Sequence, residues 1–201
     1  MSFVKLMCTK KEKYQVSVMY TLEELKQITH KCKKCRLCKG RTNVVFGEGN
    51  SEAKIMFIGE GPGYNEDIEG YPFVGAAGKL LTKAIEGIGF KRQDVYIANI
   101  VKCRPPNNRN PKEDEIEACI PYLRWQVKII KPKIIVCLGS VSARSIVDKN
   151  FSITRQRGIW IEKKGYLIMP TYHPAALLRD EKKKRPFWED FKKVKAKYLE
   201  L

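Results

Sequence analysis

The fold is decided by residues 54–63, KIMFIGEGPG, in which a short apolar run ends in a turn that holds three glycines. A continuous apolar run of this length, bounded by turn residues, predicts a strand that is buried on both faces. Similar runs recur at residues 95–101 (VYIANIV), 133–139 (KIIVCLG), 159–162 (IWIE) and 166–172 (YLIMPTY). The segment KKG between the last two runs predicts a hairpin or two neighbouring strands.

Helical patterns separate these strands. Residues 79–90 (KLLTKAIEGIGF) carry apolar residues at helical spacing, and further helices are predicted at residues 112–130, 140–147 and 186–199. Pro121 removes an amide donor inside the 112–130 helix, so a kink is expected there. Thr21 and Glu24 form a capping box that opens a helix ending near His30. Strands alternating with helices predict an α/β fold, a three-layer α/β/α sandwich with a central, mostly parallel sheet.

The chain is long enough for one domain. Its 201 residues can bury a sizeable core, and we place a single domain at residues 21–201. Residues 1–20 are Lys-rich and show no clear periodicity, so we expect a flexible N-terminal arm. No apolar run approaches the ~20 residues of a membrane span, and the first 20 residues lack the apolar core of a signal peptide. We therefore expect a cytoplasmic protein with no membrane partner.

The charge balance is strongly basic. Lys and Arg number 39 against 22 Asp and Glu, which gives a formal net charge of +17. Such an excess favours nucleic acid as a partner, because each neutralised phosphate releases counterions. A Lys-rich, thermophile-like surface is the alternative interpretation, although such a surface ordinarily carries balancing Glu.

Five of the seven cysteines suggest a ligand site. Cys32, Cys35 and Cys38 lie in one short run, Cys103 follows a predicted strand, and Cys119 comes after fifteen intervening residues. In a reducing compartment, clustered thiols are more often metal or redox ligands than disulfides. Four thiolates suit zinc or an iron–sulfur cubane, and spacing alone does not choose four among the five. Cys8 and Cys137 are expected to be small core residues.

Polar side chains gather at one edge of the predicted sheet. Ligands of such sheets bind beyond the carboxyl ends of the strands. The glycine turn at residues 59–63, Asn99 and His173 all fall at strand ends, and Phe73 lies in a turn-rich segment nearby. An amide can bond a base edge, and an aromatic ring can stack on a base. Each feature alone fits an ordinary turn or core residue, but together with the basic charge they indicate a nucleobase pocket.

The ordered motifs resemble one family. Between about Cys32 and Arg179 the chain holds, in order, CKKC, GEGPG, PFVGAAGKLL, ANIVKCRPPNNRNP, Cys119 and HPAALLR. This set resembles the family 4 uracil-DNA glycosylases, the iron–sulfur members of the uracil-DNA glycosylase superfamily, known from thermophilic bacteria and archaea. The resemblance implies the α/β/α fold and a DNA repair enzyme that flips uracil out of DNA. Such an enzyme hydrolyses the N-glycosidic bond and leaves an abasic site, with no strand cleavage.

The resemblance also assigns roles to residues. It implies a [4Fe-4S] cluster on Cys32, Cys35, Cys103 and Cys119, with Cys38 spare. The implied catalytic residues are His173, Glu60 and Glu66, and the base would lie among Glu60, Gly61, Pro62, Glu66, Phe73, Asn99 and His173. The sequence alone does not decide whether Glu60, Glu66 or neither orients the attacking water. Glu66 is also a candidate for excluding thymine, or belongs to an ordinary solvated acidic loop with Asp67 and Glu69.

Further residues are expected to contact DNA, either single- or double-stranded. By resemblance, Leu177 or Leu178 fills the place of the flipped base, Arg179 contacts the backbone, and Arg104 and Arg109 belong to the basic surface. We expect a monomer, and the sequence identifies no replication-clamp partner. The leading alternative is a non-enzymatic, metal- or cluster-dependent nucleic-acid-binding module. An iron–sulfur electron carrier is disfavoured, since it needs no base-sized polar pocket.

Overall fold

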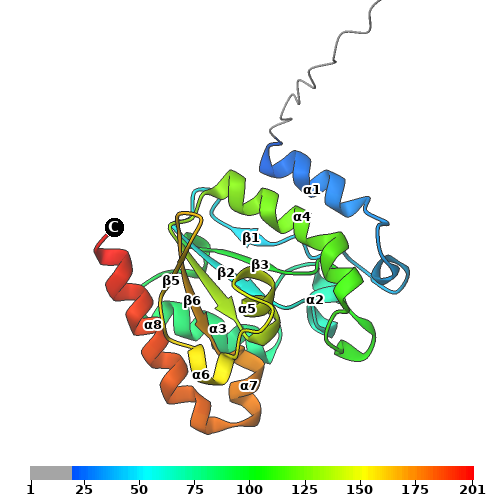
Figure 1. Cartoon of the computed structure of the whole chain (residues 1–201). Coiled ribbons are helices and arrows are strands. Elements are labelled where there is room, and N and C mark those ends of the chain that lie inside the picture. Colours follow the sequence, from blue (N-terminus) through cyan, green and yellow to red (C-terminus); the bar gives the residue numbers. More distant parts are fainter. Residues whose placement is uncertain (1–19) are drawn as a thin grey trace, which may run out of the picture.

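The computed structural model describes residues 20–201 (Figure 1). Cys8 and residues 1–19 of the predicted arm lie outside the described residues. Tyr20, which we placed in the arm, instead packs its ring edge-on against Trp125, with ring centroids 5.2 Å apart.

A six-stranded sheet forms the middle of the molecule. Its strands are β1 (Glu48–Gly49), β2 (Ile55–Gly59), β3 (Tyr96–Asn99), β4 (Ile134–Leu138), β5 (Ile161–Lys163) and β6 (Tyr166–Thr171), in the order β1-β3-β2-β4-β6-β5. The four inner strands are parallel, and the short β1 and β5 pair antiparallel at the two edges. This arrangement confirms the mostly parallel sheet, and the β5–β6 pair confirms the predicted hairpin.

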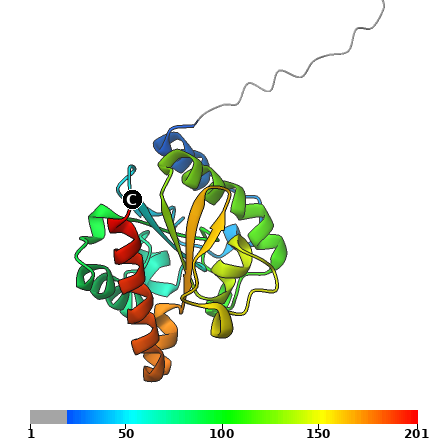
Figure 2. The ribbon, with the colours of Figure 1, turned by 60° about the vertical axis from the view of Figure 1, so that its left-hand side comes forward.

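Helices cover both faces of the sheet, which gives three layers. One face carries α1 (Leu22–His30), α4 (Glu113–Ile130) and α5 (Ser140–Ile146), and the other carries α3 (Ala76–Gly87) and α8 (Lys184–Leu199). Figure 2 shows α3 and α8 on one side of the strands and α4 on the other. Along β2 the residues alternate, since Met56 belongs to the α4 core and Phe57 to the α8 core. A continuous apolar strand is thus buried on both faces, as its sequence predicts.

Local sequence explains where the helices begin. The Thr21 hydroxyl accepts a hydrogen bond from the Glu24 amide at 3.2 Å, and the Glu24 carboxylate accepts one from the Thr21 amide at 2.7 Å. This reciprocal capping box confirms the predicted start of α1. Pro121 lies inside α4, as expected for the 112–130 helix. In residues 20–201, no helix is both long enough and apolar enough to cross a membrane.

Short helical segments fill the connections. They are α2 (Tyr64–Glu69), α6 (Ile153–Gln156) and α7 (Pro174–Arg179), with the 3-10 turns η1 (Arg36–Lys39), η2 (Arg92–Asp94), η3 (Pro106–Asn108) and η4 (Glu181–Lys183). Two of these segments follow a strand of the sheet directly: α2 follows β2, and α7 follows β6. Both therefore lie at the edge where parallel strands end and ligands bind.

Candidate active site and cysteine centre

A pocket opens at the carboxyl ends of the four inner strands. All the residues predicted to surround a base line it: Glu60, Gly61, Pro62, Glu66, Phe73, Asn99 and His173. They come from the segments after β2, β3 and β6, and Gly139 and Ser140 after β4 complete the wall. The structure therefore brings together side chains that are up to 113 positions apart, from Glu60 to His173.

Asn99 lines this pocket and has a buried acceptor without a partner. Its side chain is 2% exposed, and Oδ1 has no hydrogen-bond partner. Its main chain is held in place, since the Asn99 carbonyl accepts a hydrogen bond from Lys102 Nζ at 2.9 Å. A buried acceptor without a partner costs about 1–3 kcal/mol. A ligand that brings a donor to Oδ1 would recover this free energy.

Phe73 is held in a conformation that few residues with a side chain adopt. Its φ is 54°, in the left-handed region, and its ring centroid lies 5.5 Å from that of His173. Arg92 Nη2 donates a hydrogen bond to the carbonyl of Pro72, the residue immediately before Phe73, at 2.6 Å. Such strain persists only where surrounding contacts impose it. The aromatic wall of the pocket is therefore fixed before any ligand binds.

Gly59 makes room for this wall. A Cβ at Gly59 would lie 2.4 Å from Asn99 Oδ1 and 2.6 Å from Phe73 Cζ. Both distances are shorter than real Cβ contacts, so any other residue at this position would push two pocket side chains away. Steric contacts therefore require glycine at position 59. The sequence alone indicated only that glycine allows another group to approach the backbone closely.

Glu66 supports the loop that carries Phe73. Its Oε1 accepts hydrogen bonds from the Val74 and Gly75 amides at 2.9 and 3.0 Å, and its Oε2 accepts one from the Gly63 amide at 3.1 Å. Asp67 is buried and accepts hydrogen bonds from the Thr42 amide. An ordinary solvated acidic loop is therefore the wrong interpretation for these two residues.

Glu60 differs from Glu66 because its carboxylate bonds no group in residues 20–201. Burial raises the pKa of Glu60 above its ordinary value. Its main-chain carbonyl accepts a hydrogen bond from the Val101 amide at 3.1 Å, which fixes the backbone of the turn. Of the two acidic residues in the pocket, Glu60 is thus the one whose oxygens are available to a ligand or a water molecule.

His173 caps the N-terminus of α7. Its Nδ1 accepts a hydrogen bond from the Ala175 amide at 3.2 Å. Because an amide can only donate, Nδ1 carries no proton and Nε2 carries it in the neutral ring. Burial lowers the pKa of His173 to about 4, and the nearby Arg179 guanidinium acts in the same direction. At neutral pH, the imidazole is a neutral hydrogen-bond donor through Nε2.

The residues predicted to contact DNA fall into different environments. Leu178 is 51% exposed, whereas Leu177 is 2% exposed and belongs to the α8 core. Arg179 lines the pocket. Of the two leucines that could fill the place of a flipped base, only Leu178 is therefore accessible.

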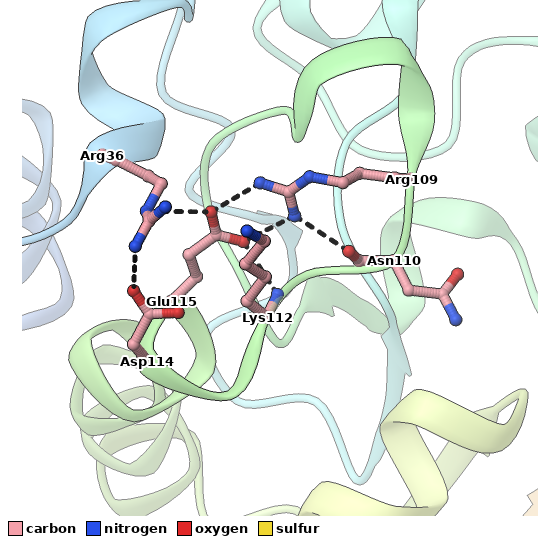
Figure 3. Close-up of polar contacts among 6 residues, drawn as sticks. All are labelled: Arg36, Arg109, Asn110, Lys112, Asp114 and Glu115. Carbon is pink, nitrogen blue, oxygen red and sulfur yellow. Dashed lines mark hydrogen bonds and ion pairs between the residues drawn. The ribbon is translucent and has the colours of Figure 1, made fainter.

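Arg109 is held by an acid that the sequence analysis missed (Figure 3). Its guanidinium donates to both carboxylate oxygens of Glu115, at 2.8 and 2.7 Å, and Glu115 is fully buried. This hydrogen bonding lowers the pKa of Glu115. Arg36 lies 3.9 Å from the same carboxylate and bonds Asp114 at 3.1 Å. The network joins the cysteine-bearing segment to the pocket rim. It also engages the Arg109 guanidinium, which we expected to contact DNA.

All five cysteines of the predicted ligand site line one narrow cavity, namely Cys32, Cys35, Cys38, Cys103 and Cys119. Donors face their sulfurs: Arg41 Nη1 lies 3.1 Å from Cys103 Sγ, and the Lys102 amide lies 3.3 Å from Cys119 Sγ. Such donors stabilise thiolates. By contrast, Cys137 is fully buried within β4, which confirms it as a core residue.

This cavity does not resemble a preformed site for one ion. In the part of the chain that the structure describes, no three His, Cys, Asp or Glu side chains gather closely enough to hold a single metal ion. Burial raises the pKa of Cys119 to about 11 and also raises that of Cys103, so the thiols need a strong positive charge to ionise. Several cysteine thiols around one cavity are the soft ligands that zinc and iron–sulfur clusters both take.

Comparisons with known proteins show the family of this chain. Residues 46–193 match the family model described as the uracil DNA glycosylase superfamily. A type-4 uracil-DNA glycosylase of Sulfurisphaera tokodaii is 54% identical over 186 residues, which cover 88% of this chain and 84% of the relative. Proteins of the same name from Thermotoga maritima (48% identical, 89% of this chain and 97% of the relative) and Archaeoglobus fulgidus (45%, 88% and 92%) are also similar. The chain therefore belongs to the type-4 family of the uracil-DNA glycosylase superfamily.

Proposed function

We propose that this chain hydrolyses the N-glycosidic bond between uracil and deoxyribose in DNA and leaves an abasic site. The unsatisfied Oδ1 of Asn99 is the observation that carries the proposal. Uracil brings a donor, N3–H, to this acceptor, and its O4 can accept from the same amide. Cytosine presents the reverse pattern on this edge, so it leaves both groups of Asn99 mispaired, at about 1–3 kcal/mol for each.

Uracil reaches this pocket only when it leaves the base stack. An enzyme acting on a base in a duplex has to flip it out, at a cost of a few kcal/mol. We assign Phe73 to stacking on the flipped base, since its ring lies beside His173 in the pocket wall. Leu178 fills the vacated place in the stack because it is exposed, and Arg179 contacts the backbone beside it.

The chemistry follows from the charge that develops on uracil. As the C1′–N1 bond breaks, its electron pair leaves with the base and negative charge grows on O2. The Nε2–H of neutral His173 donates to this oxygen, and such stabilisation is usually the largest catalytic contribution. Glu60 accepts a hydrogen bond from the water that adds to C1′, since its carboxylate has no partner in residues 20–201. Glu66 acts on the reaction only through the loop that it supports.

We further propose that Cys32, Cys35, Cys103 and Cys119 hold a [4Fe-4S] cluster and that Cys38 stays free. The shared cavity and the donors facing Cys103 and Cys119 support this assignment. When bound, the cluster would supply structure, because its four ligands lie in the turn between α1 and η1, in the loop after β3 and in α4. No step of base removal requires an electron from it.

We expect no strand cleavage. A lyase needs an amine that forms a Schiff base with C1′. Lys183 lies in the pocket lining, where its amine is engaged in an ion pair with the Asp180 carboxylate at 3.0 Å. Borohydride treatment of the reacting protein and DNA should therefore trap no covalent adduct, and a trapped adduct would contradict this assignment.

The decisive experiment measures base release from a uracil-containing oligonucleotide by anaerobically purified protein of known iron content. His173→Ala should lower the single-turnover rate by about 100- to 1,000-fold, the usual loss of one such donor, while the Kd for DNA changes little. His30→Ala, which alters the only other histidine, is the matched control and should behave as the wild type. A protein that binds DNA tightly but releases no uracil would be a binding module instead.

A further inference from the structure

An exposed aromatic ring stands at the rim of the base pocket. Tyr64 is the first residue of α2 and is 59% exposed. The Arg104 guanidinium lies over its ring, with Cζ 4.9 Å from the centroid. The Tyr64 hydroxyl bonds no group in residues 20–201, so contacts of the ring alone hold this side chain. One face of the ring is covered by a cation, and more than half of the side chain remains open to solvent.

Tyr64 and Arg104 each lie next to residues that line the pocket. Gly63, the neighbour of Tyr64, lines the pocket, and so do Pro105 and Asn108 in the loop after β3. Arg104 is itself anchored, because its Nε donates to Asn108 Oδ1 at 2.8 Å. The ring and the guanidinium are thus fixed to the two chain segments that form one wall of the pocket.

The chemistry of the pair suits a nucleotide. A base stacks on an aromatic ring whatever its sequence, and a guanidinium beneath the ring adds positive charge where phosphates pass. The net charge of +17 favours a polyanion at such a surface. A protein partner would more often cover a larger apolar patch, whereas here a single ring is paired with a cation.

We propose that Tyr64 and Arg104 form a stacking platform for the base next to the uracil on the same DNA strand. The proposal rests on the proposed function, since it requires a uracil in the pocket. In single-stranded DNA the neighbouring base is free to leave its stack, but in a duplex it stays paired with its partner. The platform therefore favours uracil in single-stranded DNA over uracil in a duplex.

A coupling experiment tests the contact by equilibrium binding, independently of base release. The probes are fluorescent single-stranded oligonucleotides with one uracil on a 2′-fluorinated deoxyribose, which resists hydrolysis, and the 5′ or the 3′ neighbour is either a normal base or a tetrahydrofuran abasic residue. With normal neighbours, Tyr64→Ala should raise Kd about tenfold, and Tyr64→Phe should retain tight binding. With the abasic residue on the stacking side, the wild type should weaken by a similar factor, and Tyr64→Ala should weaken no further.

Tyr71→Ala is the matched control. Tyr71 is 56% exposed and lines a different hollow, beside Lys79 and Thr82, so this variant should bind as the wild type does with every probe. The proposal is overturned if Tyr64→Ala binds normally, or if its loss persists with both abasic probes, because the ring would then contact the backbone. Wild-type protein that releases uracil while showing no coupling would refute the platform alone, and failure of release would refute the proposed function.

Discussion

The substitution Gly78→Ala adds one methyl group to α3. It has two opposite effects on the free energy of unfolding. Helix propensity favours Ala over Gly in a helix interior by about 1 kcal/mol, so propensity alone predicts a more stable protein. However, a Cβ at Gly78 would lie 1.8 Å from the Phe73 carbonyl oxygen. Ordinary contact begins at 3.4 Å, so the main chain at Phe73 has to move by about 1.6 Å, the difference between the two distances.

The close approach outweighs the propensity. The atoms in the way belong to the main chain, and overpacking of this kind costs about 1–3 kcal/mol or more. We expect a net loss of about 2 kcal/mol, which lowers Tm by roughly 4–8 °C in a protein of this size. The rate of uracil release should fall as well, because the displaced residue carries the aromatic wall of the pocket.

Circular dichroism melting and single-turnover release measure the two effects of Gly78→Ala. Gly40→Ala is the control, because a Cβ at Gly40 meets nothing within 4 Å and its φ of −115° suits any residue. That variant should keep the Tm and the rate of the wild type. If Gly78→Ala instead melts at the wild-type temperature or above and releases uracil normally, the close approach of α3 to Phe73 is not the constraint that we infer.

Further predictions follow from three buried polar residues. Because burial lowers the pKa of His173 to about 4, this group should not titrate in the rate of uracil release between about pH 5 and 8. In the unfolded chain it takes up a proton near pH 6.5, so the stability of the wild type should fall more than that of His173→Gln as pH drops from about 6.5 to 4. Asn99→Asp should admit cytosine, since a protonated carboxyl can satisfy its reversed edge, and release of cytosine from a cytosine-containing oligonucleotide checks this. Asp190→Ala should lose about 3–5 kcal/mol in denaturant unfolding, because this fully buried carboxylate pairs with Arg157 and accepts from Thr171.

The strands and the membership of the pocket were predictable because each depends on local or topological rules. A continuous apolar run such as residues 55–59 forms a buried strand, and parallel strands end at the same edge of the sheet. Asn99 and His173 therefore had to lie at the same edge of the sheet, although β2 and β4 separate the strands β3 and β6 that carry them there. The capping box at Thr21 was equally local, since its two partners are three residues apart.

The side-chain partners were not predictable, because they depend on contacts between distant segments. Nothing in the spacing of Glu115 indicates that it is fully buried and holds Arg109. The two adjacent leucines of HPAALLR look alike in the sequence, but the rotation of α7 buries Leu177 and exposes Leu178. Glu60 and Glu66 were equal candidates until the structure showed that main-chain amides occupy only the carboxylate of Glu66.

Lys102 shows how closely the two sites depend on each other. Its ammonium is fully buried and bonds the Asn99 carbonyl at 2.9 Å and Gln126 Oε1 at 2.6 Å, and in residues 20–201 it has no carboxylate partner. Its own amide donates to Cys119 Sγ at 3.3 Å. A buried cation without an acid is costly unless other negative charge lies nearby, and the cysteine cavity is where thiolates would provide it. Asn99, which we propose distinguishes uracil from cytosine, is therefore held through its main-chain carbonyl by the same residue that lies against the cysteines.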